Sequence, residues 1–454
     1  MAIASIEKKW TAYPVLRLDL SAGDMTEPDN LKSHLNNCIS YWEDKYGKRE
    51  TETTLADRFK GIIRRAYKQT GYGTVILIDE YDNPLFSTLG NPNTHEQMRT
   101  MLKGLYSVLK SESEHVHFCF LTGITRFSKM SVFSGLNNLQ DLTLKSQYAA
   151  ICGITQHELE TYCTEGIKTV AQVNGWDCQT ALESLKTMYD GYHFAAVSPD
   201  IYNPFSLLQA LQDGELLHYW NYSGGGTELL WRQIMTLGDD KALLDVLSPV
   251  VELYGLGISS DGSQSLESLL FQTGYLTIKG ASDDGEYFRL GLPNREVEKG
   301  MMRGLLPLAA RRRTTDLNAD ILHLKSYADN GRIDEMMSYL RSFLAGVSNR
   351  LTKKMPEIYY ENNLFILFKL IGIRVSVEVE TSDGRMDVLM ECRHYTYIIE
   401  LKLDHSAEAA LEQIRHKRYI LPFERYHLPV IMLGINFSSQ TRNIESWKWE
   451  RIDV

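Results

Sequence analysis

The stretch TVILIDEYDNPL, residues 74–85, runs from a strongly apolar segment directly into carboxylates. The four apolar residues 75–78 predict a strand that is buried on both faces, as in parallel sheets covered by helices. Asp79 and Glu80 follow at once, so both carboxylates should lie at the carboxyl edge of that strand. Ligands bind at this edge in open α/β sheets. The stretch therefore predicts an α/β unit and a candidate ligand site in one place.

Two interpretations of Asp79 and Glu80 fit this pattern. In the first, the Asp orders a magnesium ion and the Glu polarises an attacking water, as in the Walker B segment of ATPases. In the second, an apolar strand meets an acidic turn, Asp-Glu-Tyr-Asp-Asn-Pro, and the carboxylates only keep that turn in water. The local pattern alone does not decide between them.

Strands and helices alternate on both sides of this stretch. The segments YPVLRLDLS (13–21) and VHFCFLTG (116–123) are typical of strands, and QYAAICG (147–153) is a candidate fourth strand. Helical spacing of apolar residues is found over roughly 29–70 and over 95–111. Such alternation predicts a parallel sheet with helices on both faces.

Composition excludes several classes of protein. The 454 residues are enough for two to four domains, and 43% hydrophobic with 23% charged residues is ordinary for a soluble globular protein. A net charge of −10 argues against a surface coated with basic residues, but it leaves room for a local basic groove. The six cysteines are scattered without a CxxC pair, which argues against zinc and favours a reducing cytoplasm. The start MAIASIEKKW does not resemble a signal peptide, and no apolar run approaches the length of a membrane span.

The pattern changes twice towards the C-terminus. From about 155 to 350 it is mostly helical, with aromatic-rich loops in which Tyr192, His193 and Tyr202 are interpreted as packing residues. Within it, FRLGLPNREVEKG (288–300) predicts a short strand leading into a helix. The last hundred residues predict a compact α/β unit, with a helix at 356–372, strands at 375–383, 386–392 and 396–403, a helix at 406–419 and a strand at 428–438.

Asp387, Glu400 and Lys402 form a second candidate site in this last unit. Glu400 and Lys402 are two apart in the strand TYIIELKL, so they share one face of it. If the two central strands form a tight hairpin with its turn centred between Arg393 and His394, in the polar break ECRHYT, Asp387 pairs with Glu400. Their side-chain roots would then lie roughly 5 Å apart on one face.

Two carboxylates in this position repel each other unless a cation bridges them. Magnesium suits oxygen ligands of this kind. Lys402 beside them can position a water or stabilise charge that develops on a phosphate. The alternative is a solvated hairpin face with a Glu–Lys salt bridge, and the register of Asp387 favours the metal site without excluding that alternative.

Several blocks of the sequence resemble the bacterial AAA-ATPase-like family, whose members usually carry a C-terminal PD-(D/E)XK nuclease domain. These blocks, which extend over nearly the whole chain, are LIDEYDNPL, FLTGITRFSKMSVFSGLNNLQDLTL, YDGYHF, YNPFSLL, LLFQTGYLTI and LGLPNREV. The resemblance implies that Asp79 and Glu80 are the Walker B pair, with Asp79 as a metal ligand. It also implies that Thr122 or Thr125 is the phosphate sensor and that Arg126 is a further phosphate contact.

One part of the family pattern is absent from this sequence. Family members have a strand, a GKS- or GKT-type phosphate loop and a helix ahead of YPVLRLDLS, and this chain starts after them. The only Gly-Lys pair, Gly47-Lys48, has no upstream glycine at the right spacing and no following Ser or Thr, so it is not such a loop. ATP is therefore expected to bind only if a phosphate loop is supplied from elsewhere. The resemblance also implies that the absent strand lies between 116–123 and 147–153, which predicts a gap there or direct pairing of those two strands.

The C-terminal blocks GRMDV, IIELKL and ALEQIRHKRY resemble the family's nuclease motifs. The resemblance implies that Asp387 and Glu400 bind Mg²⁺ and that these two acids and Lys402 are catalytic. By the same resemblance, Glu357 and Gln413 belong to the catalytic set.

Two helices are implied to supply these further residues. Glu357 matches an acidic position on the helix 356–372, where Glu361, one turn on, could take its place. Gln413 and Tyr419 match positions of the helix that follows the hairpin.

Basic residues gather at the end of that helix, at Arg415, His416, Lys417 and Arg418. They form either a solvated helix face or a local patch that contacts a phosphate backbone. The run Arg311 to Arg313 is interpreted as a loop or interdomain charge run.

The fold expected from these observations is α/β, with an incomplete P-loop-type parallel sheet and a helical subdomain followed by a restriction-endonuclease-like α/β domain. The expected parts are an AAA-ATPase-like core without Walker A (1–155), a mainly helical subdomain (156–300), a helical connector (301–350) and a nuclease-like domain (351–454). The expected function is magnesium-dependent nuclease action on nucleic acid, DNA rather than RNA, in the cytoplasm and without a membrane. The alternatives are a non-catalytic nucleic-acid or partner-binding protein and an ATPase completed by another chain's phosphate loop, and formation of a homo-oligomer is left open.

Overall fold

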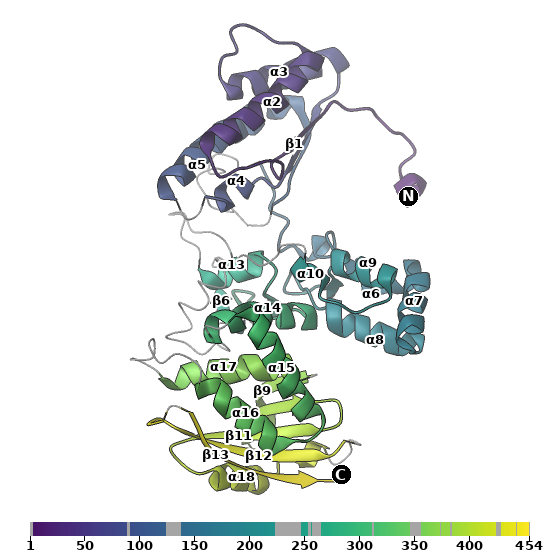
Figure 1. Ribbon diagram of the computed structural model, residues 1–454. Helices are drawn as coiled ribbons and strands as arrows, with labels where there is room; N and C mark the ends of the chain where they lie inside the picture. The colour runs from purple at the N-terminus through teal and green to yellow at the C-terminus, as the bar shows by residue number, and fades with distance from the viewer. Residues whose placement is uncertain are drawn as a thin grey trace.

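The structure is a computed structural model, and three regions follow one another along its length (Figure 1). An N-terminal α/β unit lies at one end, helices and a small sheet occupy the middle, and a larger sheet lies at the C-terminal end. The described residues are 3–88, 91–123, 138–222, 247–252, 256, 265–310, 313–345, 356–372, 374–381, 384–423, 428–441 and 443–453.

The N-terminal unit is built on a parallel three-stranded sheet in the order β1-β2-β3. Leu18 pairs with Ile78, which in turn pairs with Leu121, so the three carboxyl ends lie at one edge. Its elements are α1 (Ile3–Ile6), β1 (Val15–Asp19), α2 (Pro28–Tyr46), α3 (Leu55–Thr70), β2 (Thr74–Asp79), α4 (Asn83–Phe86), α5 (Pro92–Ser111), the 3₁₀ turn η1 (Ser113–His115) and β3 (Val116–Leu121). The three strands expected around residues 74–85 are thus confirmed.

The sheet of this unit has one buried and one more open face. Leu18 and Ile78 join the core formed with α2, α3 and α5. On the opposite face Val15 and Phe118 are about half exposed. The expectation of helices on both faces is therefore not met within the described ranges, because the strands alternate buried and open positions.

Two local expectations in this region are wrong. The helical stretch 29–70 is divided into α2 and α3, because α2 ends at Gly47 with φ of +89° and Thr54 caps the start of α3 by accepting from the Asp57 N–H. The segment 147–153 is not a fourth strand. It begins in a 3₁₀ turn, η2 (Ser146–Tyr148), and continues in turns. Its small alanines have low strand propensity, and an apolar run this short does not by itself specify a strand.

The middle region begins with a helical layer that packs around tyrosines. Tyr189 and Tyr202 are fully buried and Tyr192 nearly so, which confirms that Tyr192 and Tyr202 are packing residues. The His193 ring lies against Asp200, 3.1 Å from its carboxylate. The elements are β4 (Ile154–Thr155), α6 (Gln156–Tyr162), α7 (Thr164–Asn174), α8 (Cys178–Tyr189), β5 (Ile201–Tyr202), α9 (Pro204–Asp213) and α10 (Tyr219–Tyr222).

A small antiparallel sheet follows, in the order β6-β8-β7. The strand expected near residue 288 is β8, whereas β6 and β7 were not anticipated. The elements are β6 (Val250–Glu252), α13 (Leu266–Gln272), β7 (Thr277–Ala281) and β8 (Tyr287–Gly291), followed by the helices α14 (Arg295–Ala310), α15 (Thr314–Asp329) and α16 (Ile333–Ala345).

The C-terminal region is a five-stranded sheet in the order β13-β12-β11-β10-β9, in which only the pair β11–β12 is parallel. Helices α16 and α17 lie on one side of this sheet and α18 on the other (Figure 1). The elements are α17 (Pro356–Ile371), β9 (Arg374–Thr381), β10 (Gly384–Glu391), β11 (Thr396–Leu403), α18 (Ala407–His416), the 3₁₀ turn η4 (Leu421–Phe423), β12 (Val430–Ser438) and β13 (Asn443–Ile452). The expected helix, three strands, helix and strand are present, and β13 is an additional edge strand.

Helix α14 connects the middle region to this sheet. Lys369 of α17 forms an ion pair with Glu298 of α14, and Lys299 donates to the Gly372 carbonyl at the end of α17 at 3.0 Å. Met301 and Leu305 belong to the same hydrophobic core as residues of α17 and of strands β9 to β13. One core therefore extends from α14 through the end of α17 to the C-terminal sheet.

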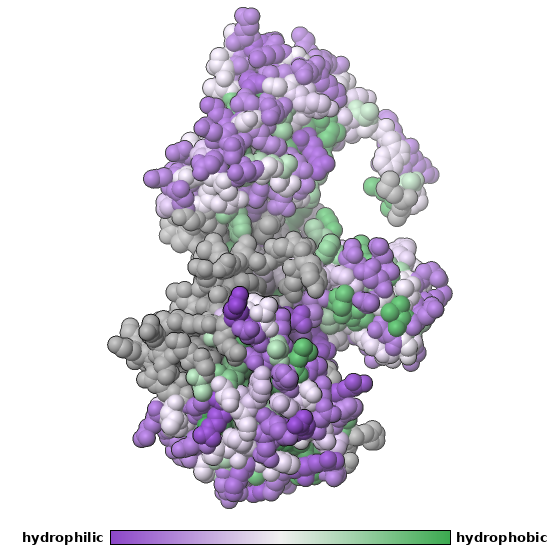
Figure 2. Space-filling view, in the orientation of Figure 1, coloured by the Kyte–Doolittle hydropathy of each residue, from purple (hydrophilic) through white to green (hydrophobic). Residues whose placement is uncertain are grey.

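The face shown in Figure 2 carries both hydrophilic and apolar residues. Hydrophilic residues predominate over the N-terminal unit and the C-terminal sheet, and apolar residues occur there in small groups. Among the helices described, none combines the length and the apolar character that crossing a membrane requires.

Candidate active site

The β10–β11 hairpin brings Asp387 and Glu400 to one place. Val388 pairs with Ile399 and Leu389 with Ile398, which is the register expected for a turn centred between residues 393 and 394. The paired register ends at Val388 and Ile399, so Asp387 and Glu400 are not paired in it, and the Asp387 carboxylate accepts the backbone N–H of Leu401 at 2.8 Å. This bond holds Asp387 beside the strand position that carries Glu400.

Glu400 is a buried carboxylate with an incomplete set of partners. The residue is only 1% exposed to solvent. The Oε1 atom accepts the Lys402 ammonium at 2.9 Å and the side-chain amide of Gln413, whereas Oε2 has no hydrogen-bond partner within the described chain. Burial raises the pKa of Glu400, Lys402 opposes that rise, and the charge of Asp387 adds to it.

Helix α18 positions Gln413 over this carboxylate. The helix starts at the cap Ser406, whose hydroxyl accepts the Ala409 N–H, and its apolar residues Leu411 and Ile414 are buried. Gly434 lies on β12 opposite Glu400 in the parallel pair. A methyl group at Gly434 would lie 2.4 Å from the Ala407 carbonyl oxygen, so only glycine lets α18 approach the sheet this closely.

Tyr419 closes the site on the side of β10. It is 1% exposed, and its hydroxyl donates to the Arg385 carbonyl at 2.7 Å. Burial raises the pKa of this phenol, and the charges of Glu400 and Asp387 contribute to the rise. A Cβ at Gly384 would lie 3.1 Å from the Tyr419 oxygen, so the chain passes very close to the ring here. Arg385 and Gly384 were not singled out as site residues in the sequence, although both lie in the block GRMDV.

Glu357 lies in the first turn of α17, and its side chain, like that of Glu361, is outside the described part of the structure. The structure therefore brings together Asp387, Glu400, Lys402 and Gln413, and it leaves the expected role of Glu357 as a prediction.

The chemistry of these residues fits a hard divalent cation. Two adjacent carboxylates offer oxygens, and one of those oxygens, Glu400 Oε2, is buried without a donor from the part of the chain that the structure describes. A cation beside this oxygen would compensate the buried charge of Glu400 and the repulsion between it and the Asp387 carboxylate. No group of three or more His, Cys, Asp or Glu side chains arranged for a metal ion occurs in the described ranges.

The second candidate site lies at the carboxyl edge of the N-terminal sheet. The Thr122 hydroxyl donates to Asp79 Oδ1 at 2.5 Å, and the Arg17 guanidinium lies 3.6 Å from Asp79 Oδ2. Asp19 pairs with Asp79 in the register of β1 and β2. Arg17 and Asp19 were not anticipated, although a strand-end Asp is visible in the sequence YPVLRLDLS.

Glu80 directly follows this strand in an unusual backbone conformation. Its φ of +53° lies in the left-handed region, which is uncommon for a residue with a side chain. Burial raises the pKa of its carboxyl group, and Asp82, Asp79 and Asp19 add to the rise. Thr125 and Arg126 lie outside the described residues. The structure thus joins Asp79 to Thr122 and places Glu80 among three further carboxylates.

Comparison with known proteins assigns both ends of the chain. Residues 1–133 match the family described as predicted AAA-ATPase, AAA-ATPase-like, and residues 355–447 match the PD-(D/E)XK nuclease superfamily. A protein of Azotobacter chroococcum mcd 1, described as an uncharacterized protein in the vnfD 5′ region, is 30% identical over 447 residues. The alignment covers 95% of this chain and 82% of that relative.

Proposed function

Because the chain belongs to the family of predicted AAA-ATPase-like proteins with a C-terminal PD-(D/E)XK nuclease superfamily domain, we propose that its C-terminal unit hydrolyses phosphodiester bonds in a magnesium-dependent reaction. The proposed substrate is nucleic acid, DNA rather than RNA. The observation that carries the proposal is the meeting of Asp387, Glu400, Lys402 and Gln413 on one side of the β10–β11 hairpin.

Each side chain has a role that follows from its contacts. Asp387 and the free oxygen of Glu400 would hold the metal ion, which supplies charge stabilisation for the phosphoryl oxygens and a more acidic water when bound. Lys402 already lies at the carboxylate, so its ammonium is placed to orient a water or to stabilise negative charge on the phosphate. Gln413 fixes the orientation of Glu400 through its amide. The proposed set also includes Glu357, which starts α17.

The test is cleavage of labelled DNA and RNA by the full chain, with Mg²⁺ and with EDTA. We expect cleavage only with the metal, and Asp387→Asn should abolish it while the chain stays folded. Glu391→Gln is the matched control. Glu391 lies four residues further along the same strand, at the turn end of the hairpin, and should be dispensable. Metal-independent cleavage, or full activity of Asp387→Asn, would contradict the proposal.

For the N-terminal unit, we propose that Asp79, Glu80 and Thr122 are the magnesium half of a nucleotide site. The strand-end position of Asp79 and its bond to Thr122 support this role. We further propose that β1 to β3 belong to a P-loop-type sheet whose remaining strands would extend from β3, since β3 pairs only with β2 within the described ranges. ATP turnover at this site would need a phosphate loop that supplies backbone N–H groups and a lysine.

We also propose that the protein acts in a reducing compartment such as the cytoplasm. All six cysteines are free thiols. Disulfides form and persist mainly in oxidising compartments, so this thiol content supports the proposal.

A further inference from the structure

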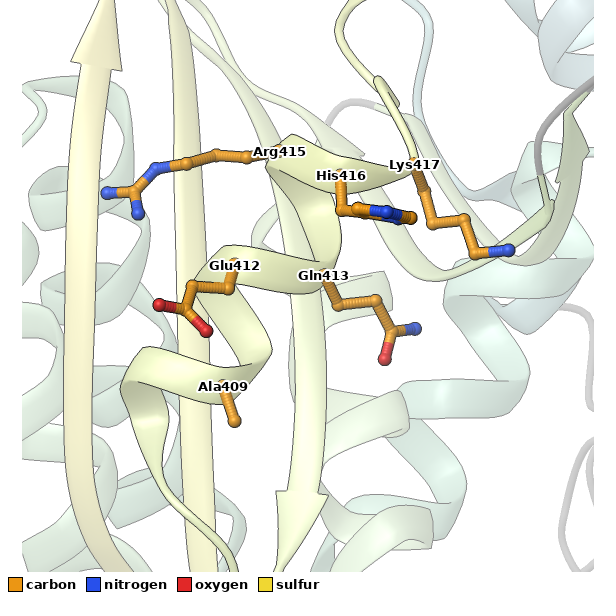
Figure 3. A pocket seen from close by; sticks show the side chains of 6 residues that line it. All are labelled: Ala409, Glu412, Gln413, Arg415, His416 and Lys417. Atoms are coloured by element: carbon orange, nitrogen blue, oxygen red, sulfur yellow. The ribbon is translucent and has the colours of Figure 1, made fainter.

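Helix α18 presents different chemistry on its two sides. Towards β13, Glu408 forms an ion pair with Lys448, and Arg415 forms one with Glu450. Towards β11, Gln413 donates to Glu400. Figure 3 shows the same division, since the Arg415 side chain extends to one side of the helix and the Gln413 and Lys417 side chains to the other.

The four basic residues at the end of this helix are therefore not equivalent. Arg415 is neutralised, because its Nε lies 3.1 Å from Glu450 and its Nη1 lies 3.6 Å from Glu408. The side chains of Lys417 and His416 have no ion pair or hydrogen bond with any described residue. The surface that they share with Gln413 is a hollow of about 820 Å³, lined by Ala409, Glu412, Gln413, Arg415, His416 and Lys417.

Lys417 is anchored next to the candidate active site. Its backbone N–H donates to the Gln413 carbonyl at 2.9 Å. Its aliphatic stem passes over Gly384, with Cδ 3.4 Å and Cε 3.6 Å from where a Cβ of that residue would lie. Gly384 begins β10, three residues before Asp387. The stem thus lies against the start of β10, the strand that carries Asp387, and the residue is exposed, so its ammonium stays in water.

A cation at this position would offset the negative charge that the candidate active site presents to a nucleic acid. The chain carries a net charge of −10, and Asp387 and Glu400 add local negative charge where a polyanion must approach. Lys417 lines the same surface as Gln413, which bonds Glu400, so its ammonium is placed to bind a phosphate group next to the reacting one.

We propose that Lys417, with His416 beside it, forms a subsite that binds a backbone phosphate of the nucleic-acid strand adjacent to the bond cleaved at Asp387 and Glu400. This assignment rests on the proposed nuclease function. It divides the basic cluster: Lys417 and His416 contact the substrate, and Arg415 fastens α18 to the edge strand β13.

The experiment measures binding without cleavage. Ca²⁺ replaces Mg²⁺, and the affinity of the full chain for a short labelled DNA duplex and for the corresponding single strand is followed between about 50 and 200 mM salt. The variants are Lys417→Gln and the matched Arg415→Gln, which removes the same charge two residues away. Inorganic phosphate is added as a competitor, because a site for free phosphate would be emptied by it at low concentration.

We expect Lys417→Gln to reduce the slope of log affinity against log salt by about 0.9 for duplex DNA, or about 0.7 for a single strand, as the loss of one phosphate contact predicts. Arg415→Gln should leave the slope unchanged, and Lys417→Arg should restore it. Equal slopes for Lys417→Gln and the wild type would overturn the proposal, as would an equal reduction for both variants. A lowered melting temperature of Lys417→Gln with an unchanged slope would show a helix-end role only. Displacement by low concentrations of free phosphate would also overturn it.

The two proposals fail in different ways. If the wild type cleaves DNA but Lys417→Gln keeps the slope, only the subsite is refuted. If the slope changes but no metal-dependent cleavage occurs, hydrolysis is refuted, and Lys417 is a phosphate contact of a protein that binds nucleic acid without cleaving it. If the wild type binds no nucleic acid, both are refuted.

Discussion

Replacing Glu400 by glutamine should stabilise the C-terminal unit when no metal is present and should remove its response to magnesium. Glu400 is 1% exposed, and its Oε2 has no hydrogen-bond partner within the described chain. An unsatisfied buried polar atom costs about 1–3 kcal/mol, and more when it carries charge. An amide of the same shape removes the charge and can donate to the Asp387 carboxylate.

The stability lost by weakening the hydrogen bond from Lys402 is smaller than this gain. The Lys402 ammonium bonds Glu400 at 2.9 Å, and hydrogen bonds to charged groups contribute about 1.5–3 kcal/mol. A neutral amide oxygen keeps roughly half of that contribution. The difference leaves a net stabilisation of about 1 kcal/mol, which corresponds to a rise of about 2–4 °C in the melting temperature of a unit of 150–250 residues.

The effect should depend on pH in a defined direction. The folded-state pKa of Glu400 is raised above its ordinary value of 4.5, so the folded chain binds more protons than the unfolded chain between these two values. Wild-type stability therefore falls as pH rises through this window, and the penalty is fully present above the raised pKa. The advantage of Glu400→Gln should accordingly disappear as the pH approaches 4.5.

The assay is thermal unfolding of the full chain across this pH range, first in EDTA and then with Mg²⁺. Magnesium should stabilise the wild type, because a ligand that binds only the folded state shifts the equilibrium towards it, and it should not stabilise Glu400→Gln. Glu391→Gln should behave as the wild type. A variant less stable than the wild type in EDTA at pH above neutrality, or equally stabilised by Mg²⁺, would refute the reasoning.

Three further outcomes are expected. Gly434→Ala should destabilise the C-terminal unit by about 2–3 kcal/mol and reduce cleavage, because the added methyl group would lie 2.4 Å from the Ala407 carbonyl oxygen and 2.8 Å from the Leu411 nitrogen. Urea unfolding measures the loss of stability. The control is Gly104→Ala, whose methyl group would meet nothing within 4 Å and which should lose no stability. Lys402→Ala should lower the cleavage rate more than it lowers metal affinity, because a protonated lysine has no lone pair for a metal; calorimetric Mg²⁺ titration beside single-turnover cleavage would reveal the opposite order. The chain alone should show no specific ATP binding by calorimetry, because Asp79 holds magnesium only weakly without phosphate ligands from a phosphate loop; micromolar affinity that disappears in Asp79→Ala would count against this.

The sequence predicted the hairpin of the C-terminal unit because that structure is local. The polar break ECRHYT between two apolar runs fixes the turn, and the turn fixes the pairing of Val388 with Ile399. The contact between Gln413 and Glu400 was not derivable from spacing, because it depends on how closely α18 approaches β12. Gly434 sets that distance from more than twenty positions away in the chain.

Other elements of the fold were not predicted from the sequence, for identifiable reasons. In β13, Asn443–Ile452, charged residues such as Lys448 and Glu450 interrupt the apolar pattern, which suits an edge strand but hides it from a search for apolar runs. The segment 147–153 failed in the opposite way, since a short apolar run there forms turns. The separate fates of Arg415 and Lys417 depended on the position of Glu450, which the sequence did not give.

The continuous core beneath α14 also determines where the chain can be cut. The nuclease superfamily match begins at residue 355, yet Leu367 and Phe368 of α17 share their core with Met301 and Leu305 of α14. A fragment that starts at 355 would present this apolar surface to water, and such patches promote aggregation. A fragment that includes α14 keeps the α17 surface covered and retains the ion pair between Glu298 and Lys369, but α14 also shares this core with Leu270 and Leu276 upstream of it. For recombinant expression and crystallisation, a cut between α14 and α17 should therefore be avoided.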